Sequence, residues 1–425
     1  MGTGVIDTVM AGHHGKVSLA AIGIGTSIYV TIVFGLFGIV QVVAPLAAEH
    51  YGAGRSAEVG EEVRQAFWLD LVLAGIAISL LLAPERLVAF TGARAEVAVE
   101  ACRFLRAMAW TAPAALAFRT FSLFFTAVLR PRPVLLLNVA ILLLKAPLNA
   151  LLLYSPFGLP SLGVAGLGYA SAISLWCGVA AAFAYVRIDP VLQPFRLTHD
   201  WSWPKARRIA ALLQLGVPNG VVQVIEISSF TFMALFIARL GTVASAGHQI
   251  AANLTGIAFM LPLALSTATS VLVAQRLGAG ERREAAGQAK AGLSLAAALA
   301  TVVAVGYGVL SPVLATLYSG DAAVLAQATA LIRAAAVFHW FDAMQVVLFG
   351  ILRAYRSTLV PLFIYTLTLW GIGLGGGLRW AFSGVAGLPP AGAVGFWWAA
   401  IAGVAVCAAA LRIWLGRVQA RSNHS

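Results

Sequence analysis

The sequence predicts an all-α polytopic membrane protein. Hydrophobic residues make up 60% of the chain and charged residues 10%, and the mean hydropathy is +0.90. A typical soluble domain carries about 25% charged residues. Twelve apolar runs follow one another, and the second half of the chain repeats landmarks of the first half. These observations predict twelve transmembrane helices, the first of them truncated, arranged as two parallel six-helix repeats.

The apolar runs alternate with polar loops along the whole chain. They lie at residues 1–12, 17–47, 64–83, 99–128, 133–154, 163–187, 206–238, 245–276, 286–317, 324–352, 358–384 and 394–416. All but the first are close to or longer than the ~20 residues that cross a bilayer as a helix. One set of alternate loops, together with the tail, carries most of the Lys and Arg residues. By the positive-inside rule this set is cytoplasmic, so both termini lie inside. The net charge of +12 therefore reports membrane topology, and we expect no nucleic-acid partner.

The repeat is visible in matching sequence landmarks. Gly-Ala-Gly closes an apolar run at 52–54 and again at 278–280, each time before a charged turn. Six runs per half is an even number, so both halves enter the membrane from the same side, with a central cavity between them. We expect an N-terminal lobe at 1–187, a cytoplasmic linker at 188–205, a C-terminal lobe at 206–417 and a cytoplasmic tail at 418–425.

The first run, MGTGVIDTVMAG, is too short to span a bilayer. It has no basic segment before it, so it does not read as a signal peptide. We expect that Met1 lies inside the first helix and that an upstream start supplies the missing half. The alternative is a re-entrant or shortened helix.

Two carboxylates interrupt apolar runs of the second half. A charged residue at a helix centre costs roughly 2.5–3.5 kcal/mol, and such groups usually face a cavity or a partner. Glu226 lies between Ile225 and Ile227, and Asp342 lies in the tenth run. Gln223 precedes Glu226 by three residues and shares its helical face.

Asn253, in the eighth run, adds an amide to this set. Oxygen ligands of this kind suit Na⁺, a proton relay or an organic cation, and Na⁺ would bind at Glu226 and Asp342. The alternative is that each carboxyl group is protonated and only packs.

The first half contains a different set of polar residues. Asp7 lies in the short first run, and Lys145 and Asn149 lie in the fifth run, far from its ends. Lys145 could extend toward the membrane surface or pair with Asp7. If it pairs, Lys145 acts as an internal cation, and ion coupling falls to Glu226 and Asp342.

Other function classes lack supporting patterns. Cys102, Cys177 and Cys407 are widely spaced, which indicates neither a disulfide framework nor a zinc site. No nucleophile–base arrangement or phosphate-binding loop is evident, so we expect a transporter without a cofactor rather than an enzyme.

Several long motifs resemble the multidrug and toxic compound extrusion (MATE) family, most closely its NorM-type branch. These are VIDTVMAG at 5–12, APLAAEHYGAGR at 44–55, KAPLNALLLYSPFGLPSLGVAGLGYASA at 145–172, LGTVASAGHQIAANL at 240–254 and GILRAYRST at 350–358. They occur in the family's order along nearly the whole chain. The resemblance implies two six-helix bundles arranged as a V and a secondary antiporter of the plasma (inner) membrane. Such an antiporter exports organic cations in exchange for Na⁺ or H⁺.

The resemblance also implies roles for single residues. Asp7 matches the family's first-helix aspartate, and Asn149 matches its fifth-helix PLN motif. Glu226 and Asp342 match the acidic residues of the seventh and tenth helices that NorM-type members use for cation binding. Two departures are the short first helix and Lys145, which stands where relatives often have Asn and puts a cation site in the N-terminal lobe in doubt.

Other readings of the sequence remain open. The chain could be a lipid-linked oligosaccharide flippase of the same superfamily, although such proteins tend to have more spans and basic cavities. If Met1 is the true start, an inactive, N-terminally truncated transporter becomes a rival. A non-transporting receptor or scaffold is disfavoured by acidic residues inside both halves. We expect a monomer whose partners are membrane lipid and small organic cations.

Overall fold

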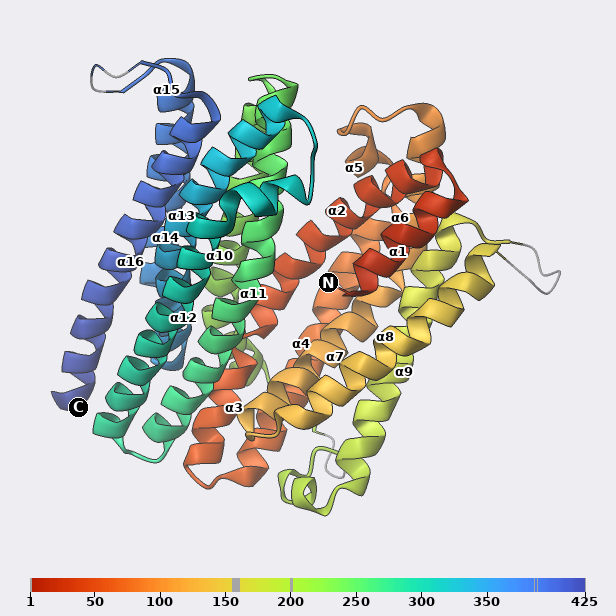
Figure 1. Cartoon of the computed structure of the whole chain (residues 1–425). Coiled ribbons are helices and arrows are strands. Elements are labelled where there is room, and N and C mark those ends of the chain that lie inside the picture. Colours follow the sequence, from red (N-terminus) through yellow and green to blue (C-terminus); the bar gives the residue numbers. More distant parts are fainter. Residues whose placement is uncertain (1, 155–160, 199–201, 386, 388, 425) are drawn as a thin grey trace. The chain divides into compact units, whose positions relative to one another are not determined.

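The structure is a computed structural model that describes residues 2–154, 161–198, 202–385, 387 and 389–424. Every regular element in these residues is helical (Figure 1). Ten helical segments among them are long and apolar enough to cross a membrane. Met1 and part of the motif at 145–172, residues 155–160, lie outside the described residues. The all-α membrane architecture predicted from the sequence is confirmed.

The chain forms two compact units. The N-terminal unit comprises Met1–Tyr51 and Arg55–Gly220, and the C-terminal unit comprises Gly52–Gly54 and Val221–Ser425. The boundary thus falls inside a helix, α10 (Ala206–Ala238). The helices of the N-terminal unit before α10 are α1 (Gly2–His14), α2 (Lys16–Val40), α3 (Val43–Gly52), α4 (Ser56–Leu82), α5 (Glu85–Ala89), α6 (Ala95–Ala109), α7 (Thr111–Ala127), α8 (Pro131–Tyr154), α9 (Val164–Ile188) and the 3₁₀ helix η1 (Pro190–Phe195).

Two of the predicted runs are each divided into two helices. In the run at 17–47, α2 ends at Val40 and α3 begins at Val43. In the run at 99–128, Trp110 separates α6 from α7. A proline follows each break, Pro45 in α3 and Pro113 in α7. Proline has no amide hydrogen to donate to the carbonyl four residues earlier. The missing hydrogen bond weakens the helix at these points, where it is interrupted.

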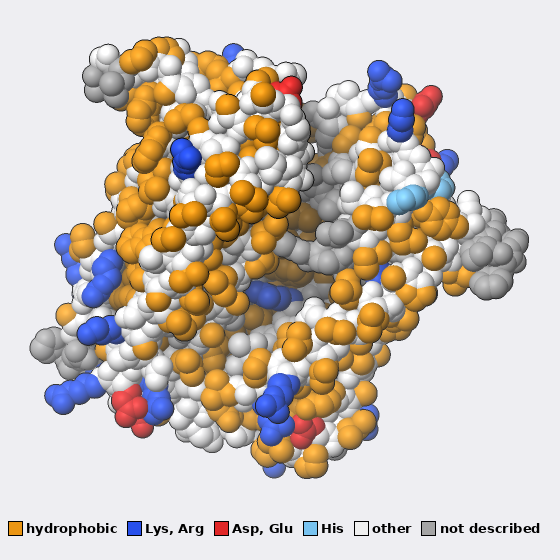
Figure 2. Space-filling view, viewed as in Figure 1, with side chains coloured by type: hydrophobic (Ala, Val, Ile, Leu, Met, Phe, Trp, Pro, Cys, Tyr) orange, Lys and Arg blue, Asp and Glu red, His pale blue; other side chains and the backbone are white. Residues whose placement is uncertain are grey.

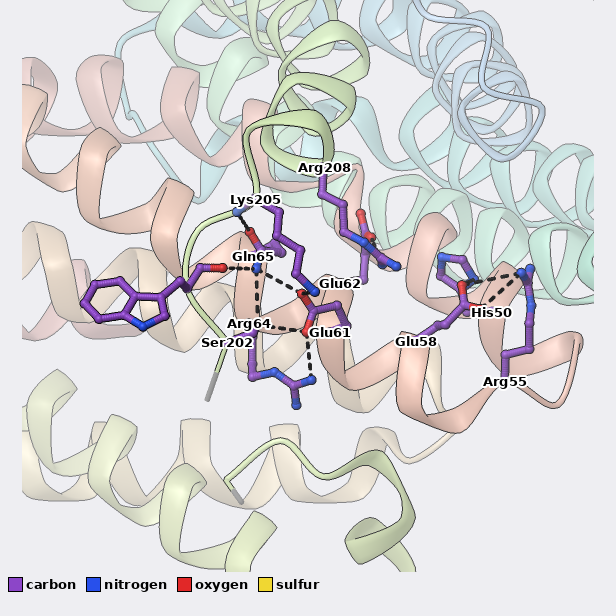
Figure 3. Close-up of polar contacts among 11 residues, drawn as sticks. His50, Arg55, Glu58, Glu61, Glu62, Arg64, Gln65, Ser202, Lys205 and Arg208 are labelled. Atoms are coloured by element: carbon purple, nitrogen blue, oxygen red, sulfur yellow. Dashed lines mark hydrogen bonds and ion pairs between the residues drawn. The ribbon is translucent and has the colours of Figure 1, made fainter. Parts of the chain in front are cut away.

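The linker that follows α9 is held against the beginning of α4 (Figure 3). Glu61 accepts a hydrogen bond from the Ser202 hydroxyl at 2.8 Å and pairs with the Lys205 ammonium at 2.9 Å. The Arg64 guanidinium lies 2.9 Å from the same carboxylate. The amide oxygen of Gln65 accepts the backbone N–H of Lys205 at 2.7 Å. We call these five residues, Glu61, Arg64, Gln65, Ser202 and Lys205, the linker clamp.

The C-terminal unit is built around one buried helix. After α10 its elements are α11 (Thr242–Gly278), α12 (Arg282–Thr316), α13 (Ala322–Ala354), α14 (Leu359–Tyr365), the π-helical segment η2 (Thr366–Gly375), α15 (Gly376–Phe382) and α16 (Gly392–His424). Helix α13 packs against α11, α12 and α16. The central position of α13 explains why so many of its polar side chains are buried.

The eleventh predicted run becomes three consecutive elements rather than one α-helix. The π-helical segment η2 lies against α16, and Gly403 of α16 comes so close that an added Cβ would lie 2.7 Å from the Thr368 carbonyl oxygen. Wide helical turns of this kind are rare and often occur at functional sites. Here the segment contributes to the wall of a pocket.

The surface agrees with a membrane location. Hydrophobic side chains cover much of the face shown in Figure 2, and the acidic side chains visible there lie near its upper and lower ends. Such an apolar surface suits lipid, because charged groups are costly in the bilayer interior.

Candidate functional site

Two carboxylates of the C-terminal unit line the same pocket. Glu226 of α10 and Asp342 of α13 border a pocket with an empty volume of ≈ 460 Å³. Aromatic side chains of three elements form much of its wall, namely Phe230, Phe338 and Phe396. The two residues lie 116 positions apart in sequence, so only the packing of α10 and α13 brings them together.

Asp342 is held in place by its own helix. Its side chain is 3% exposed, and the Gln345 amide donates a hydrogen bond to its Oδ1 at 2.9 Å. Gln345 lies one turn further along α13, a spacing at which helical side chains meet. Ser229, one turn after Glu226, also lines the pocket and donates its hydroxyl hydrogen to the Ile225 carbonyl at 2.7 Å. The hydroxyl and amide oxygens therefore add neutral oxygen atoms to the two carboxylates.

The pocket has the chemistry of a cation site. Two ionised carboxylates around one apolar pocket repel each other, and a proton or another cation relieves that repulsion. Carboxylate and carbonyl oxygens suit hard cations. Within the part of the chain that the structure describes, no three His, Cys, Asp or Glu side chains gather as metal ligands. A bound Na⁺ would thus need neutral oxygens, such as those of Ser229 and Gln345, besides the carboxylates.

The N-terminal unit carries a buried carboxylate, Asp7, that already has a cation beside it. The Lys145 ammonium lies 2.6 Å from Asp7 Oδ2, and the Asn149 amide donates to Asp7 Oδ1 at 2.7 Å. Asp7 and Lys145 are 6% and 4% exposed. The pairing of Lys145 with Asp7, one of the two possibilities raised by the sequence, is present. Helix α1 supplies the carboxylate and α8 supplies both partners.

Two residues predicted to support the carboxylates lie elsewhere. Gln223 and Asn253 are not among the described residues that line the pocket. Asn253 is exposed and accepts a hydrogen bond from the Tyr318 hydroxyl at 2.8 Å. Asn219, on the same face of α10 as Gln223, is buried and donates to the Gly38 carbonyl of α2. Helical spacing in the sequence showed that Gln223 and Glu226 share one face of α10. It did not show which part of that face borders the pocket.

Among the charged residues inside spans that the sequence analysis missed are Asp70 and Arg119. Asp70 of α4 is buried and accepts a hydrogen bond from the Thr120 hydroxyl of α7 at 2.6 Å. Arg119, the residue before Thr120, lies with its guanidinium over the Phe37 ring of α2. Both residues interrupt apolar runs, as Glu226 does, so the same cost argument would have identified them.

Comparison with known proteins agrees with the motifs. The MatE family profile matches residues 1–151 and 218–377 of the chain. The chain is 38% identical over 417 residues to the probable multidrug resistance protein NorM of Aromatoleum aromaticum, with 98% of this chain and 90% of the relative covered. It is 33% identical over 372 residues to the multidrug resistance protein PmpM of Pseudomonas aeruginosa, covering 87% of this chain and 78% of that protein.

Solved structures show the same fold at lower sequence identity. The eukaryotic MATE transporter AtDTX14 matches with a TM-score of 0.85 and 20% identity, over 99% of this chain and 93% of that one. The MATE transporter VcmN of Vibrio cholerae in its bent form matches with a TM-score of 0.86 and 17% identity, again over 99% and 93%. The resemblance read from the motifs is confirmed: the chain belongs to the MatE family, whose members are secondary transporters and not enzymes.

Proposed function

We propose that this protein exports organic cations across the membrane in exchange for inward movement of Na⁺ or H⁺. The observation that carries the proposal is the shared pocket of Glu226 and Asp342, which combines two acidic groups with aromatic walls. Organic cations bind well to aromatic faces, and the carboxylates supply the opposite charge. The names of the relatives, which describe multidrug resistance proteins, support the same activity.

The exchange follows from competition for one anionic site. In the outward-facing state Glu226 and Asp342 take up Na⁺ or H⁺, which lowers the affinity for a cationic substrate. The substrate leaves, the protein changes to its inward-facing state, and the ion is released to the cytoplasm. Each ligand weakens binding of the other by the same factor, because coupling between two ligands is reciprocal.

The N-terminal unit contributes differently to this mechanism. The Lys145 ammonium already neutralises Asp7 at 2.6 Å, so this carboxylate offers little attraction to a second cation. Ion coupling is therefore carried by Glu226 and Asp342. The protein works as a monomer in the plasma (inner) membrane, with both termini in the cytoplasm and Na⁺ or H⁺ as its only inorganic ligand.

The proposal is tested with a double variant, Glu226→Gln with Asp342→Asn, which keeps side-chain size and removes both charges. The variant and the parent chain are reconstituted into vesicles, and export of a fluorescent organic cation is followed under a Na⁺ gradient and a pH gradient imposed separately. We expect the double variant to fall to the level of empty vesicles, because no anionic group then remains in the pocket. The gradient that drives the parent chain identifies the coupling ion.

A matched control keeps the test specific. Glu96→Gln removes one carboxylate from the exposed first turn of α6 and should leave export unchanged. Export by the double variant that still follows either gradient at the parent rate would contradict the proposal.

A further inference from the structure

Asp70 places a carboxylate at the middle of a membrane-spanning helix of the N-terminal unit. It lies fourteen residues after the start of α4 at Ser56 and twelve before its end at Leu82, which leaves about 20 Å of helix on either side. Asp70 is 4% exposed, whereas Leu71 and Val72, the next two residues, are each 62% exposed. Asp70 therefore faces the interior of the unit, and a carboxylate at such depth is a candidate functional group.

Only one of the two carboxylate oxygens has a hydrogen-bond donor among the described residues. Oδ2 accepts the hydroxyl hydrogen of Thr120, a fully buried residue of α7, at 2.6 Å. Oδ1 has no hydrogen-bond partner in the described part of the chain. Phe67, one turn earlier on α4, lies against Phe121 of α7 with the ring centres 4.9 Å apart. The surroundings on this side are apolar, and a buried polar group without a partner calls for an explanation.

No described basic side chain pairs with Asp70. Helices α2, α6, α7 and η1 pack against α4. Arg119 of α7 precedes Thr120 in the chain, but its guanidinium lies over the Phe37 ring of α2, and η1 contains no charged residue. The charged residues of α2 and α6 lie in the first turns of these helices or in ion pairs of their own, namely Lys16, Glu96, Glu100, Arg103 and Arg106. Two further titratable groups, Tyr29 of α2 and Cys102 of α6, pack against a separate hydrophobic cluster.

An ionised carboxylate in this position is poorly compensated. Burying a charge without a counter-charge is costly, and a group in such a place is neutralised by taking up a proton. A proton binds without a cavity, because it becomes part of the carboxyl group. The Thr120 hydroxyl can both donate and accept a hydrogen bond, so it can partner the acid as well as the carboxylate. Ionisation adds negative charge to Oδ1, which lacks a donor, and this favours entry of water between α4 and α7.

We propose that Asp70 and Thr120 form a proton-binding site that controls how tightly α4 packs against α7. With the proton bound, the contact is dry and closed; without it, water enters and the contact loosens. In this way the pH regulates the rate of export separately from the ion that drives it. The site is distinct from Asp7, whose charge Lys145 already neutralises, and from the acidic pocket of the C-terminal unit.

The link to the export rate rests on the proposed export function, but proton binding and packing are measured without transport. On the purified full chain, infrared spectroscopy follows the carbonyl band of protonated carboxyl groups over a series of pH values. Hydrogen–deuterium exchange of peptides from α4 and α7 follows the packing of the two helices. The compared proteins are the parent chain, Asp70→Asn and Thr120→Val.

We expect part of the infrared band of the parent chain to disappear as the pH is raised. Asp70→Asn, a permanently neutral side chain of the same size, should lack this part of the band. Thr120→Val should shift its frequency, because the hydrogen bond is lost. At alkaline pH the amides of α4 and α7 should exchange about tenfold faster or more in the parent chain than in Asp70→Asn, since leaving a charged acceptor unsatisfied costs at least this factor. Comparing two proteins at one pH removes the intrinsic effect of pH on amide exchange.

Export is measured as exchange of labelled for unlabelled ethidium across vesicles that have the same pH on both sides. Raising the pH should slow the parent chain more than Asp70→Asn, by about tenfold for each pH unit once most sites have lost their proton. Titration of the acidic pocket is common to both proteins and cancels in the comparison. Glu96→Gln, which removes an exposed carboxylate from the first turn of α6, is the control and should match the parent chain in all three measurements.

The outcomes separate the two proposals. If the parent chain exchanges no ethidium at any pH but its infrared band and amide exchange respond to pH through Asp70, the export function fails and the proton site stands. A band that persists at every pH, or that is unchanged in Asp70→Asn, would overturn the site. Equal amide exchange in the parent chain and Asp70→Asn at alkaline pH would show that the proton does not control packing and would overturn the proposal. Equal pH profiles of ethidium exchange in these two proteins would overturn the control of export.

Discussion

At the scale of single residues, the contact between Asp7 and Lys145 is the one whose removal is most informative. The two side chains are buried and 2.6 Å apart, and Asn149 completes the hydrogen bonding of the carboxylate. Removing one partner from a buried ion pair typically costs about 3–5 kcal/mol, because the other charge is left uncompensated. We therefore expect Lys145→Asn to lower the thermal stability of the purified protein clearly.

The same variant should also change ion dependence, because Asp7 becomes free to bind a cation. Adding Asp7→Asn to Lys145→Asn removes both charges and should restore most of the lost stability. The measurements are thermal unfolding in detergent and export under separate Na⁺ and pH gradients. Unaltered transport and ion dependence in Lys145→Asn would show that this pair does not act as an internal cation site.

Part of the site could be predicted from the sequence, because the cost of burying a charge in the membrane depends only on the residue and the apolar run around it. A carboxylate within an apolar run is costly wherever it occurs, and this identified Glu226 and Asp342. The position of Gln223 relative to the pocket could not be predicted in this way. It depends on how α10 is rotated against its neighbours, which is a property of packing between distant segments. The contact between Arg119 of α7 and the Phe37 ring of α2 depends on packing in the same way.

At the scale of elements, the twelve apolar runs correspond to helical segments, but their internal breaks were not predicted. Pro45 and Pro113 mark the interruptions of two runs, and proline is a visible signal. The π-helical segment η2 has no such signal. It lies where Gly403 lets α16 approach its backbone, so a residue about 30 positions away along the chain determines the close fit.

Gly403→Ala tests that dependence. Its Cβ would lie 2.7 Å from the Thr368 carbonyl oxygen and 3.2 Å from the Gly373 nitrogen, so η2 would have to move. Inserting one methyl group into a tight contact typically costs about 1–3 kcal/mol. We expect a lower unfolding temperature, measured in detergent by intrinsic fluorescence, together with weaker cation binding because Gly373 lines the pocket.

The matched control for this change is Gly306→Ala in α12, where an added Cβ meets nothing within 4 Å. Alanine is the better helix former by about 1 kcal/mol, so this variant should be unchanged or slightly more stable. Equal effects of the two substitutions would mean that the close approach of α16 does not maintain η2.

At the scale of the whole molecule, the connection between the two repeats is held against α4 by side chains that include the carboxylate of Glu61. Glu61 bonds Ser202 and Lys205 of the linker and Arg64 of its own helix, and its side chain is 10% exposed while that of Lys205 is 54% exposed. The linker clamp therefore combines a buried anchor with an accessible basic residue. Local opening of such a segment can be measured without unfolding the protein, because proteolysis reports the population of the open form.

Glu61→Gln is expected to release the linker while leaving the helices folded. The substitution keeps an oxygen acceptor but removes the charge that attracts Arg64 and Lys205, and hydrogen bonds to charged groups contribute about 1.5–3 kcal/mol. Trypsin cleavage after Lys205 should accelerate by about tenfold or more, as read by fragment mass, with little change in unfolding temperature.

Glu58→Gln is the control, because Glu58 pairs with the exposed Arg55 one turn earlier on the same segment. Equal cleavage rates in both variants would show that the linker is held by its backbone contacts alone. Faster cleavage in Glu61→Gln alone would assign the restraint to this charge, and the connection between the repeats would then be fixed by a single ionised group.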